Sequence, residues 1–249
     1  MYPNNYKLYK TLDSTNQEAK RLSLLNHPET WVLALKQTRG RGRNGKVWLT
    51  GTNGFAASLL YYPKISFSEM ILRSYVAGIA LYDCVCKIGV SKNLLTLKWP
   101  NDLLLEGQKV AGILVETFTR GDKVIAPLII GFGVNLGSCP NRDDLEKDAI
   151  IPGSLEQSGL CIPKPEQFLT MLMPIYQYWD SYLITHGFKR LRQEFLNRTF
   201  PIGQQIRVRK VNGAITGLFS GIRTDGALKL VSSSGTVFVT AGDVFLIGE

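Results

Sequence analysis

The chain has 249 residues, of which 45% are hydrophobic and 20% are charged. These proportions are typical of globular proteins, so they exclude a disordered chain, a collagen and a coiled coil, and they provide enough apolar side chains for a sizeable core. The formal net charge of +9 raises the question of a polyanionic partner. The sequence has no run of about 18 uncharged apolar residues, which argues against a transmembrane helix.

The sequence carries no sign of export. Residues 1–10 mix Tyr, Asn and Lys without an apolar core, unlike a signal peptide. The four cysteines are too few for a disulfide framework, and none has the spacing of a zinc ligand: Cys84, Cys86, Cys139 and Cys161. We therefore expect a cytoplasmic protein with reduced thiols.

Much of the excess positive charge lies in one stretch. Between Glu29 and Glu69 the sequence has no acidic residue, and the basic residues of that gap are Lys36, Arg39, Arg41, Arg43, Lys46 and Lys64. Most of them are interleaved with glycines in a short segment. A nucleic-acid-binding face usually spreads its charge along a stripe or a helix, whereas a compact loop suits a small polyanion.

Hydrophobic periodicity predicts the elements in chain order. A helix is predicted over residues 15–25, opened by a capping box at Thr15–Glu18, and a second helix is predicted over residues 68–88. A third is predicted over residues 166–198, where Pro174 should bend or interrupt it. The predicted strands are rich in Val, Ile and Leu: Trp31–Leu35, Phe55–Tyr62, Leu95–Trp99, Leu103–Leu105, Val110–Thr117 and Val124–Val134.

The residue pattern changes toward the C-terminus. Residues 139–165 contain four prolines and are predicted to be a long connection. Over residues 203–249, short alternating runs separated by glycines predict a small β-barrel of about five strands. We therefore predict a larger domain over residues 1–200 and a barrel over residues 201–249.

Histidine chemistry is disfavoured. The two histidines, His27 and His186, lie far along the chain from the Gly-rich segments, which argues against a histidine-based triad. No H-E-x-x-H or Walker A motif is present. An enzyme with this sequence is expected to work by positioning and electrostatic stabilisation.

The segment Gln37–Trp48 is the densest candidate site. Its glycines let the backbone approach a ligand, and its alternate arginines can form charge-assisted bonds to phosphate or carboxylate. Trp48 can cover an aromatic or apolar group. A similar composition occurs in disordered RNA-binding tails, but predicted strands flank this segment on both sides.

Three further segments place polar residues beside predicted strands. Lys98–Asp102 puts a cation, an aromatic ring and a carboxylate at a strand end, a pattern that an ordinary turn also explains. Lys109–Glu116 is predicted as a buried strand in which Gly112 marks a close approach. Gly131–Asn135 has two strand glycines before an asparagine, which suggests a flat group lying on the backbone, and it lacks the spacing of a dinucleotide-binding motif.

Together and in this order, these segments resemble the biotin–protein ligase family. The matching motifs are D-S-T-N at residues 13–16, followed by G-R-G-R-x-G-x-x-W, K-W-P-N-D, K-x-A-G-I-L-V-E and G-x-G-x-N. The resemblance covers essentially the whole chain. It implies an α+β fold, with a class II synthetase-like biotin–lipoyl ligase catalytic domain and a small C-terminal SH3-like β-barrel. No helix-turn-helix module precedes the motifs, so the chain resembles the monofunctional class.

The resemblance implies a two-step reaction with biotin and ATP as substrates and Mg²⁺ as cofactor. Biotin and Mg-ATP give biotinyl-5′-AMP and pyrophosphate, and a lysine of a biotin carboxyl carrier protein domain then takes the biotinyl group and releases AMP. Both first-step reactants are anions, so their repulsion must be screened before the carboxylate attacks the α-phosphate. The resemblance implies no specific DNA, no membrane, and a monomer or homodimer.

Roles for individual residues are also implied by the matching motifs. Lys109 is implied as the main electrostatic catalyst, and Arg41 as the group that orders the loop. The implied biotin-binding residues are Ser14, Thr15, Asn16, Gln37, Gly40, Arg41, Lys109 and Gly112. The implied ATP-binding residues are Arg43, Lys46, Trp48, Lys98, Asn101, Asp102 and Asn135, of which Asp102 would also support Mg²⁺ through the phosphates.

Some positions leave other interpretations open. Arg39 stands where the family often has a small residue, and Lys46 where it often has arginine, whose planar fork lysine lacks. Ser14 and Thr15 can also be helix caps. A lipoate or octanoate–protein ligase of the same fold class lacks the match to G-R-G-R, and an RNA-binding module fits poorly because residues 203–249 hold five basic and three acidic residues, a net charge of only +2.

Overall fold

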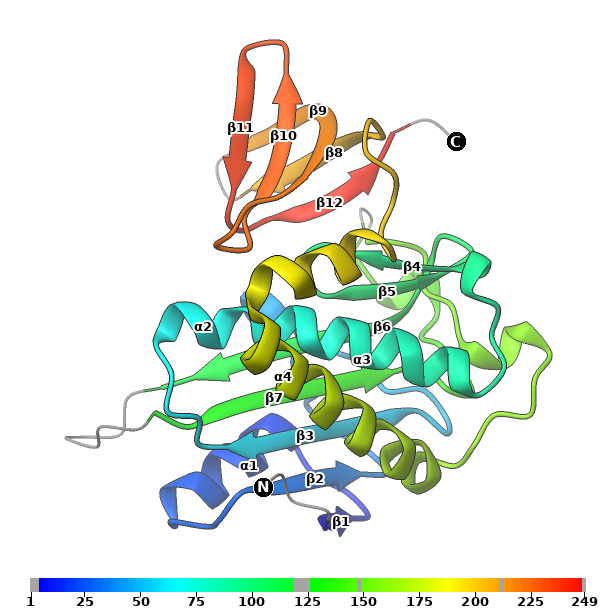
Figure 1. The fold of residues 1–249 in the computed structure, drawn as a ribbon. Coiled ribbons are helices and arrows are strands. Elements are labelled where there is room, and N and C mark those ends of the chain that lie inside the picture. Colours follow the sequence, from blue (N-terminus) through cyan, green and yellow to red (C-terminus); the bar gives the residue numbers. More distant parts are fainter. Residues whose placement is uncertain (1–4, 119–125, 147–148, 211–212, 248–249) are drawn as a thin grey trace.

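The computed structural model describes residues 5–118, 126–146, 149–210 and 213–247. Two sheets organise this part of the chain (Figure 1). The seven-stranded sheet has the order β1-β2-β3-β7-β6-β5-β4, and the five-stranded sheet has the order β11-β10-β9-β8-β12. In Figure 1 the smaller sheet stands beyond the β4–β5 end of the larger one.

The large sheet is mixed. The strands β1 and β2 run parallel, and every other pair of neighbouring strands in this sheet is antiparallel. Its strands are β1 (Tyr6–Tyr9), β2 (Thr30–Ala34), β3 (Phe55–Tyr61), β4 (Leu95–Lys98), β5 (Asp102–Leu105), β6 (Gln108–Thr117) and β7 (Leu128–Val134). All but β1 correspond to predicted strands. The beginning of the strand predicted from Val124 lies outside the described residues.

Alternation along the strands directs apolar side chains to both faces of the sheet. On one face, α1 (Thr15–Leu24) packs Ala19 and Leu22 against apolar side chains of β2, β3 and β7. The other face is covered by α3 (Arg73–Lys87) and α4 (Pro165–Leu196), which pack against each other (Figure 1). The main core lies under these two helices and contains large buried rings, including Trp31 and Phe132.

The helix starts differ from the predicted ones. The capping box at Thr15–Glu18 is wrong, because Ser14 is the N-cap residue and its side chain makes no capping hydrogen bond within the described chain. Thr15 is instead the first helical residue, and its amide donates to Gln37 Oε1 over 2.8 Å. The predicted helix at 68–88 is divided into α2 (Phe67–Ile71), which has a capping box of its own, and α3.

The long helix α4 runs through Pro174, and the described break in it falls later, at Gly187. Gly187 has φ 71° and ψ 168°, a conformation that is open to glycine and strained for other residues. The predicted connection before α4 contains two short 3₁₀ turns, η3 (Arg142–Asp144) and η4 (Leu155–Ser158). Two others, η1 (Arg43–Gly45) and η2 (Lys92–Leu94), lie earlier in the chain.

The small sheet consists of five antiparallel strands, in agreement with the predicted barrel: β8 (Gln205–Lys210), β9 (Gly213–Ile222), β10 (Leu228–Ser232), β11 (Gly235–Val239) and β12 (Asp243–Leu246). It is fixed to the large domain at Gly226, whose carbonyl oxygen accepts hydrogen bonds from Tyr75 Oη (2.6 Å) and Trp99 Nε1 (3.1 Å). The predicted boundary near residue 200 falls between α4 and β8.

Within the described residues, no helix is both long enough and apolar enough to cross a membrane. All four cysteines lie in this part of the chain, and each is a free thiol.

A buried ion pair joins the two covering helices. Arg73 of α3 and Asp180 of α4 lie 3.0 Å apart, with side-chain exposures of 4% and 1%. We expect Asp180→Asn to lower the free energy of unfolding by about 3 kcal/mol or more, because the Arg73 guanidinium would stay buried without its counter-charge. Urea denaturation measures the loss.

The matched control is Asp225→Asn, which changes an exposed pair with Arg223 and should lower the free energy of unfolding far less, because solvent screens that pair. Equal losses in the two variants would contradict a special role for the buried pair.

Candidate active site

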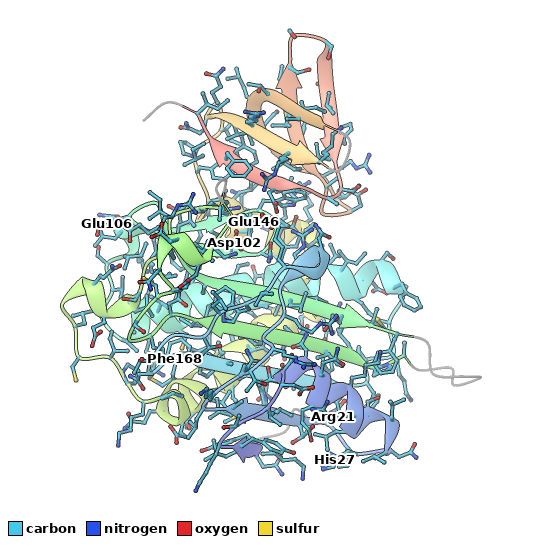
Figure 2. The ribbon with its side chains drawn as sticks, turned by 180° about the vertical axis from the view of Figure 1, so that it is seen from behind. Arg21, His27, Asp102, Glu106, Glu146 and Phe168 are labelled. Atoms are coloured by element: carbon cyan, nitrogen blue, oxygen red, sulfur yellow. The ribbon has the colours of Figure 1, made fainter. Side chains whose placement is uncertain are left out.

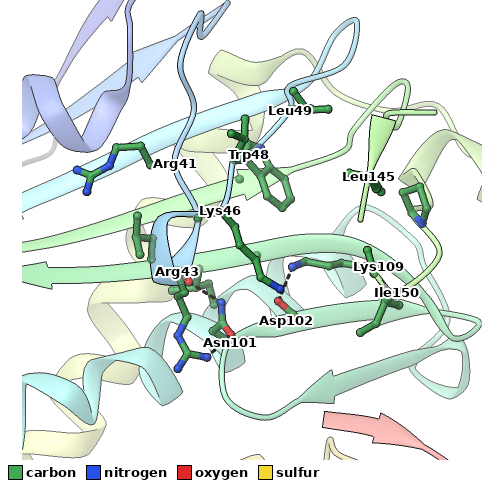
Figure 3. Close-up of a pocket in the computed structure, with 18 of the residues that line it drawn as sticks. Arg41, Arg43, Lys46, Trp48, Leu49, Asn101, Asp102, Lys109, Leu145 and Ile150 are labelled. Carbon is green, nitrogen blue, oxygen red and sulfur yellow. Dashed lines mark hydrogen bonds and ion pairs between the residues drawn. The ribbon is translucent and has the colours of Figure 1, made fainter. Parts of the chain in front are cut away.

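A cavity of about 490 Å³ lies over β5, β6 and β7 (Figure 3). Its walls come from the start of α1, the Gly/Arg segment (Gln37–Trp48), the connection after β7, and strands β8 and β12 of the barrel. Among the residues implied by the motifs, fourteen line this cavity: Ser14, Thr15, Asn16, Gln37, Arg41, Arg43, Lys46, Trp48, Lys98, Asn101, Asp102, Lys109, Gly112 and Asn135. Gly40 is the remaining one and does not line it.

Within the Gly/Arg segment, Gly40–Trp48 forms a small hairpin. The amide of Gly42 donates to the Lys46 carbonyl over 2.7 Å, and the amide of Trp48 donates to the Gly40 carbonyl over 3.0 Å. A Cβ at Gly40 would overlap the carbonyl oxygen of Trp48. Gly40 is therefore needed to close the hairpin.

Glycines in two adjacent strands make room for Trp48. A Cβ at Gly133 of β7 would overlap the Trp48 indole, and a Cβ at Gly112 of β6 would lie 3.1 Å from it. The sequence suggested a flat group on Gly131 and Gly133 and a close approach at Gly112. In the structure the Trp48 indole lies on Gly133 and Gly112, and the Asn16 amide lies on Gly131. Trp48 Nε1 is buried and has no hydrogen-bond acceptor among the described residues.

Neutral polar side chains form one part of the wall. Gln37 Oε1 accepts from the Thr15 amide, and the Thr15 hydroxyl lies 3.3 Å from the same oxygen. Ser58 Oγ lies 2.6 Å from Asn16 Oδ1, and because an amide oxygen can only accept, Ser58 donates to it. Asn16 packs so closely on β7 that a Cβ at Gly131 would overlap its amide oxygen.

A buried carboxylate links two lysines on the β4–β5–β6 side of the cavity. Asp102 lies 2.9 Å from Lys98 Nζ and 2.8 Å from Lys109 Nζ. Burial alone would raise the pKa of Asp102, but the two ammonium charges outweigh it and hold that pKa well below its usual range. Lys98 is buried, whereas Lys109 is 30% exposed at the cavity wall, where its ammonium lies 5.6 Å from the Trp48 ring centre. Figure 3 shows the Lys109–Asp102 contact.

Two cations of the loop, Arg43 and Lys46, also have side-chain partners. Arg43 donates to Asn101 Oδ1 over 3.1 Å. Lys46 contacts Asp243 of β12 at 3.0 Å and Glu146 of the connection at 3.2 Å. Burial alone would lower the pKa of Lys46, but these carboxylates outweigh it and raise that pKa.

Sequence reasoning missed the contribution of the barrel. Arg209, Asp243 and Phe245 line the cavity, and Arg209 lies 3.5 Å from Asp243 and 3.9 Å from Glu146. These residues lie outside every recognised motif, so the sequence offered no signal that pointed to them. Their placement depends on how the barrel docks on the large sheet.

Asn135 is buried, and its Nδ2 donates to the Gly153 carbonyl over 2.8 Å. In this arrangement it fixes the connection that follows β7. Its implied contact with ATP stays a prediction.

The surroundings of Asp102 do not suit a direct ligand of Mg²⁺, because two ammonium groups already face its oxygens. Within the described chain, no group of three or more His, Cys, Asp or Glu side chains could hold a metal ion. The implied link between Asp102 and Mg²⁺ through phosphates stays a prediction.

Neither histidine lines the cavity. Figure 2 shows His27 at the end of the molecule away from Asp102 and Glu146. His186 stacks on the Tyr182 ring at 4.3 Å on α4. Their positions agree with a site that does not use histidine.

Comparison with known proteins shows the family to which the chain belongs. A family model described as the biotin/lipoate A/B protein ligase family matches residues 8–135, and one described as the biotin protein ligase C terminal domain matches residues 202–247. A biotin--[acetyl-CoA-carboxylase] ligase of Paracoccus denitrificans is 37% identical over 95% of this chain and 98% of its own length. The bifunctional ligase/repressor BirA of Bacillus subtilis is 31% identical over 96% of this chain and 73% of its own.

A solved structure has the same fold. The biotin protein ligase of Aquifex aeolicus, in complex with biotin and ATP, superposes with a TM-score of 0.78 at 24% identity, covering 98% of this chain and 99% of that one. The chain belongs to the biotin protein ligase family. The α+β architecture with a C-terminal SH3-like barrel is confirmed.

The pairing of Asp102 predicts a change in acid stability. Because its folded-state pKa is lowered, Asp102 contributes stability that is present at neutral pH and is lost as the pH falls toward that pKa. Lys109→Met removes one attracting charge and raises the pKa. We expect a lower free energy of unfolding at pH 7 and a shallower decrease between about pH 5 and pH 3.

Urea denaturation over a pH series measures this slope. Lys64→Met is the control, since Lys64 is exposed and lies in the same basic stretch. Parallel curves for wild type and Lys109→Met would show that Lys109 does not set the Asp102 pKa.

Proposed function

We propose that the chain is an ATP-dependent biotin–[acetyl-CoA-carboxylase] ligase. It activates biotin as biotinyl-5′-AMP and transfers the biotinyl group to a lysine of a biotin carboxyl carrier protein domain. The observation that supports this most is a single cavity that combines a neutral polar cluster, an indole on strand glycines, and a set of cations. Those features suit the ureido group, the apolar rings and the phosphates of one adenylate.

In the first step, a carboxylate oxygen of biotin attacks the α-phosphorus of ATP, and the bond to the pyrophosphate oxygen breaks. Negative charge increases on the phosphate oxygens, and the Lys109 ammonium stabilises it. Asp102 holds Lys109 in place, and Lys98 keeps Asp102 ionised. Arg43 and Lys46 are the loop cations proposed for the other phosphates, and Mg²⁺ would accompany the nucleotide.

In the second step, the uncharged amine of the carrier lysine attacks the acyl carbon of biotinyl-5′-AMP. The acyl–phosphate bond breaks, AMP leaves with its electron pair, and the amine loses a proton to give the amide. Lys109 again stabilises the departing phosphate. The hydroxyls of Ser14 and Thr15 can both donate and accept, as a ureido group requires.

Biotin is favoured over lipoate or octanoate, because the relatives named above are biotin ligases and a biotin protein ligase model matches the barrel. An RNA-binding role is disfavoured, because Arg43 and Lys46 of the loop contact Asn101 and Asp243, two residues that line the cavity. We further propose a cytoplasmic monomer or homodimer, divided into domains 1–200 and 201–249, that uses neither DNA nor a membrane.

Exchange of label between pyrophosphate and ATP tests the first step. With purified protein and Mg²⁺, we expect exchange with biotin and none with lipoate or octanoate. Lys109→Ala should lower the biotin-dependent rate at least about tenfold, since it removes charge stabilisation of the transition state. Lys64→Ala is the matched control and should keep the wild-type rate.

Exchange with lipoate or octanoate alone would move the assignment to those ligases. A wild-type rate in Lys109→Ala would remove Lys109 from its proposed role. Absence of exchange with any of the three acids would contradict the proposed ligase.

The hairpin must open to admit biotin and close over the adenylate. We expect the amides of residues 39–48 to exchange hydrogen more slowly with biotin and ATP bound than in the free protein. Hydrogen exchange followed by mass spectrometry measures this difference. Equal protection in both states would contradict a mobile loop.

A further inference from the structure

Glu116 lies near the end of β6, one strand position from its last residue, and it is not among the described residues that line the cavity. Both of its carboxylate oxygens are engaged. Oε2 accepts from Asn16 Nδ2 over 2.8 Å, and Oε1 lies 3.2 Å from Arg41 Nη2. One carboxylate therefore joins two residues that do line the cavity and that stand 25 positions apart in the chain.

The Asn16 side of this link is rigid. Asn16 is only 4% exposed, and it accepts from Ser58 Oγ on β3 while donating to Glu116. Gly131 leaves space for its amide group and little more. Asn16 Nδ2 also lies 3.4 Å from the Leu114 carbonyl oxygen. Because each of these contacts depends on which way the amide points, Glu116, Ser58 and Leu114 together fix the amide orientation of Asn16.

The Arg41 side of the link is more open. Arg41 is 41% exposed and stands in the hairpin, where it pairs with Val47 in an isolated antiparallel bridge. The hairpin's other side-chain contacts run to different places, with Arg43 on Asn101 and Lys46 on Asp243. Trp48 packs on Gly112 and Gly133 of the sheet, whereas the Arg41–Glu116 pair links the hairpin, through the end of β6, to Asn16 of α1.

We propose that Glu116 is a positioning residue that couples the Gly/Arg hairpin to the biotin-facing side of the cavity. This role of Glu116 rests on the proposed function. Through Glu116, the position of the hairpin affects how the cavity recognises the ureido group of biotin. The carboxylate touches neither substrate. It acts through Asn16 and Arg41, so its loss should weaken biotin binding far more than ATP binding.

Glu116→Gln tests this with little change in shape. Both partners of Glu116 are donors, and a glutamine has one acceptor oxygen and one donor nitrogen, so it can satisfy only one of them. In biotin-dependent exchange we expect KM for biotin to rise about tenfold and KM for ATP to change less than about twofold. Glu106→Gln, in the exposed turn before β6, is the matched control and should keep both constants.

Hydrogen exchange of the ligand-free protein is a second measurement. A loss of packing confined to the surroundings of Glu116 would not change the exchange of the hairpin amides. The amides of residues 40–48 should exchange faster in Glu116→Gln than in wild type, and Arg41→Met should give the same change. Arg41→Met leaves the sheet intact, so it tests the link even where Glu116→Gln folds poorly. In the double variant the rise in KM for biotin should be smaller than the product of the two single rises.

The outcomes separate the two claims. Wild-type protein without biotin-dependent exchange would overturn the ligase and, with it, the role of Glu116. An active wild type with unchanged KM and unchanged loop exchange in Glu116→Gln would overturn the coupling alone. Multiplicative effects in the double variant would also overturn it, because Glu116 would then not act through Arg41.

Discussion

The cavity brings like charges together, and the structure depends on how the protein holds them there. Six basic side chains line it, and for each the described chain supplies an acceptor within 4 Å: Arg41 with Glu116, Arg43 with Asn101, Lys46 with Asp243 and Glu146, Lys98 and Lys109 with Asp102, and Arg209 with Asp243 and Glu146. Without these acceptors, mutual repulsion would push the loop, the connection and the barrel apart. An anionic ligand therefore enters a site whose cations already have partners, and binding is an exchange of partners. The exchange is easiest where the partner is exposed, as at Glu146, and hardest at buried Asp102.

The cations differ in role because their partners differ in exposure. Lys98 is as buried as its carboxylate, so it sets the charge of Asp102 and has little access to a ligand. Lys109 shares the same carboxylate but faces the cavity, which combines a fixed position with access to a developing charge. Lys46 lies between the exposed carboxylate of Glu146 and the half-buried carboxylate of Asp243, so its contact with Glu146 can be released at low cost.

Much of the fold was readable from the sequence, because strand and helix periods depend on local chemistry. The motif residues could be assigned to one site because the motifs, in their order, resemble those of the biotin–protein ligase family. Two kinds of information were not local. The role of Gly112 and Gly133 as a platform for Trp48 requires knowing that β6 and β7 are neighbours. The capping box failed for a related reason, because Gln37, twenty-two residues away, takes the amide of Thr15 that a cap would otherwise satisfy.

The barrel shows what sequence patterns leave out. Its strands were predictable, but Arg209 and Asp243 reach the cavity because the barrel is docked there. The hydrogen bonds that Gly226 receives from Tyr75 and Trp99 help to fix the barrel against α3 and the end of β4. Gly226 has φ 86°, and a Cβ there would lie 3.1 Å from the Tyr75 ring, so the docking point requires a glycine. Trp99 belongs to the same K-W-P-N-D motif that supplies Lys98 and Asp102. A single motif therefore contributes both to the central charge of the cavity and to the hydrogen bonds that place the barrel beside it.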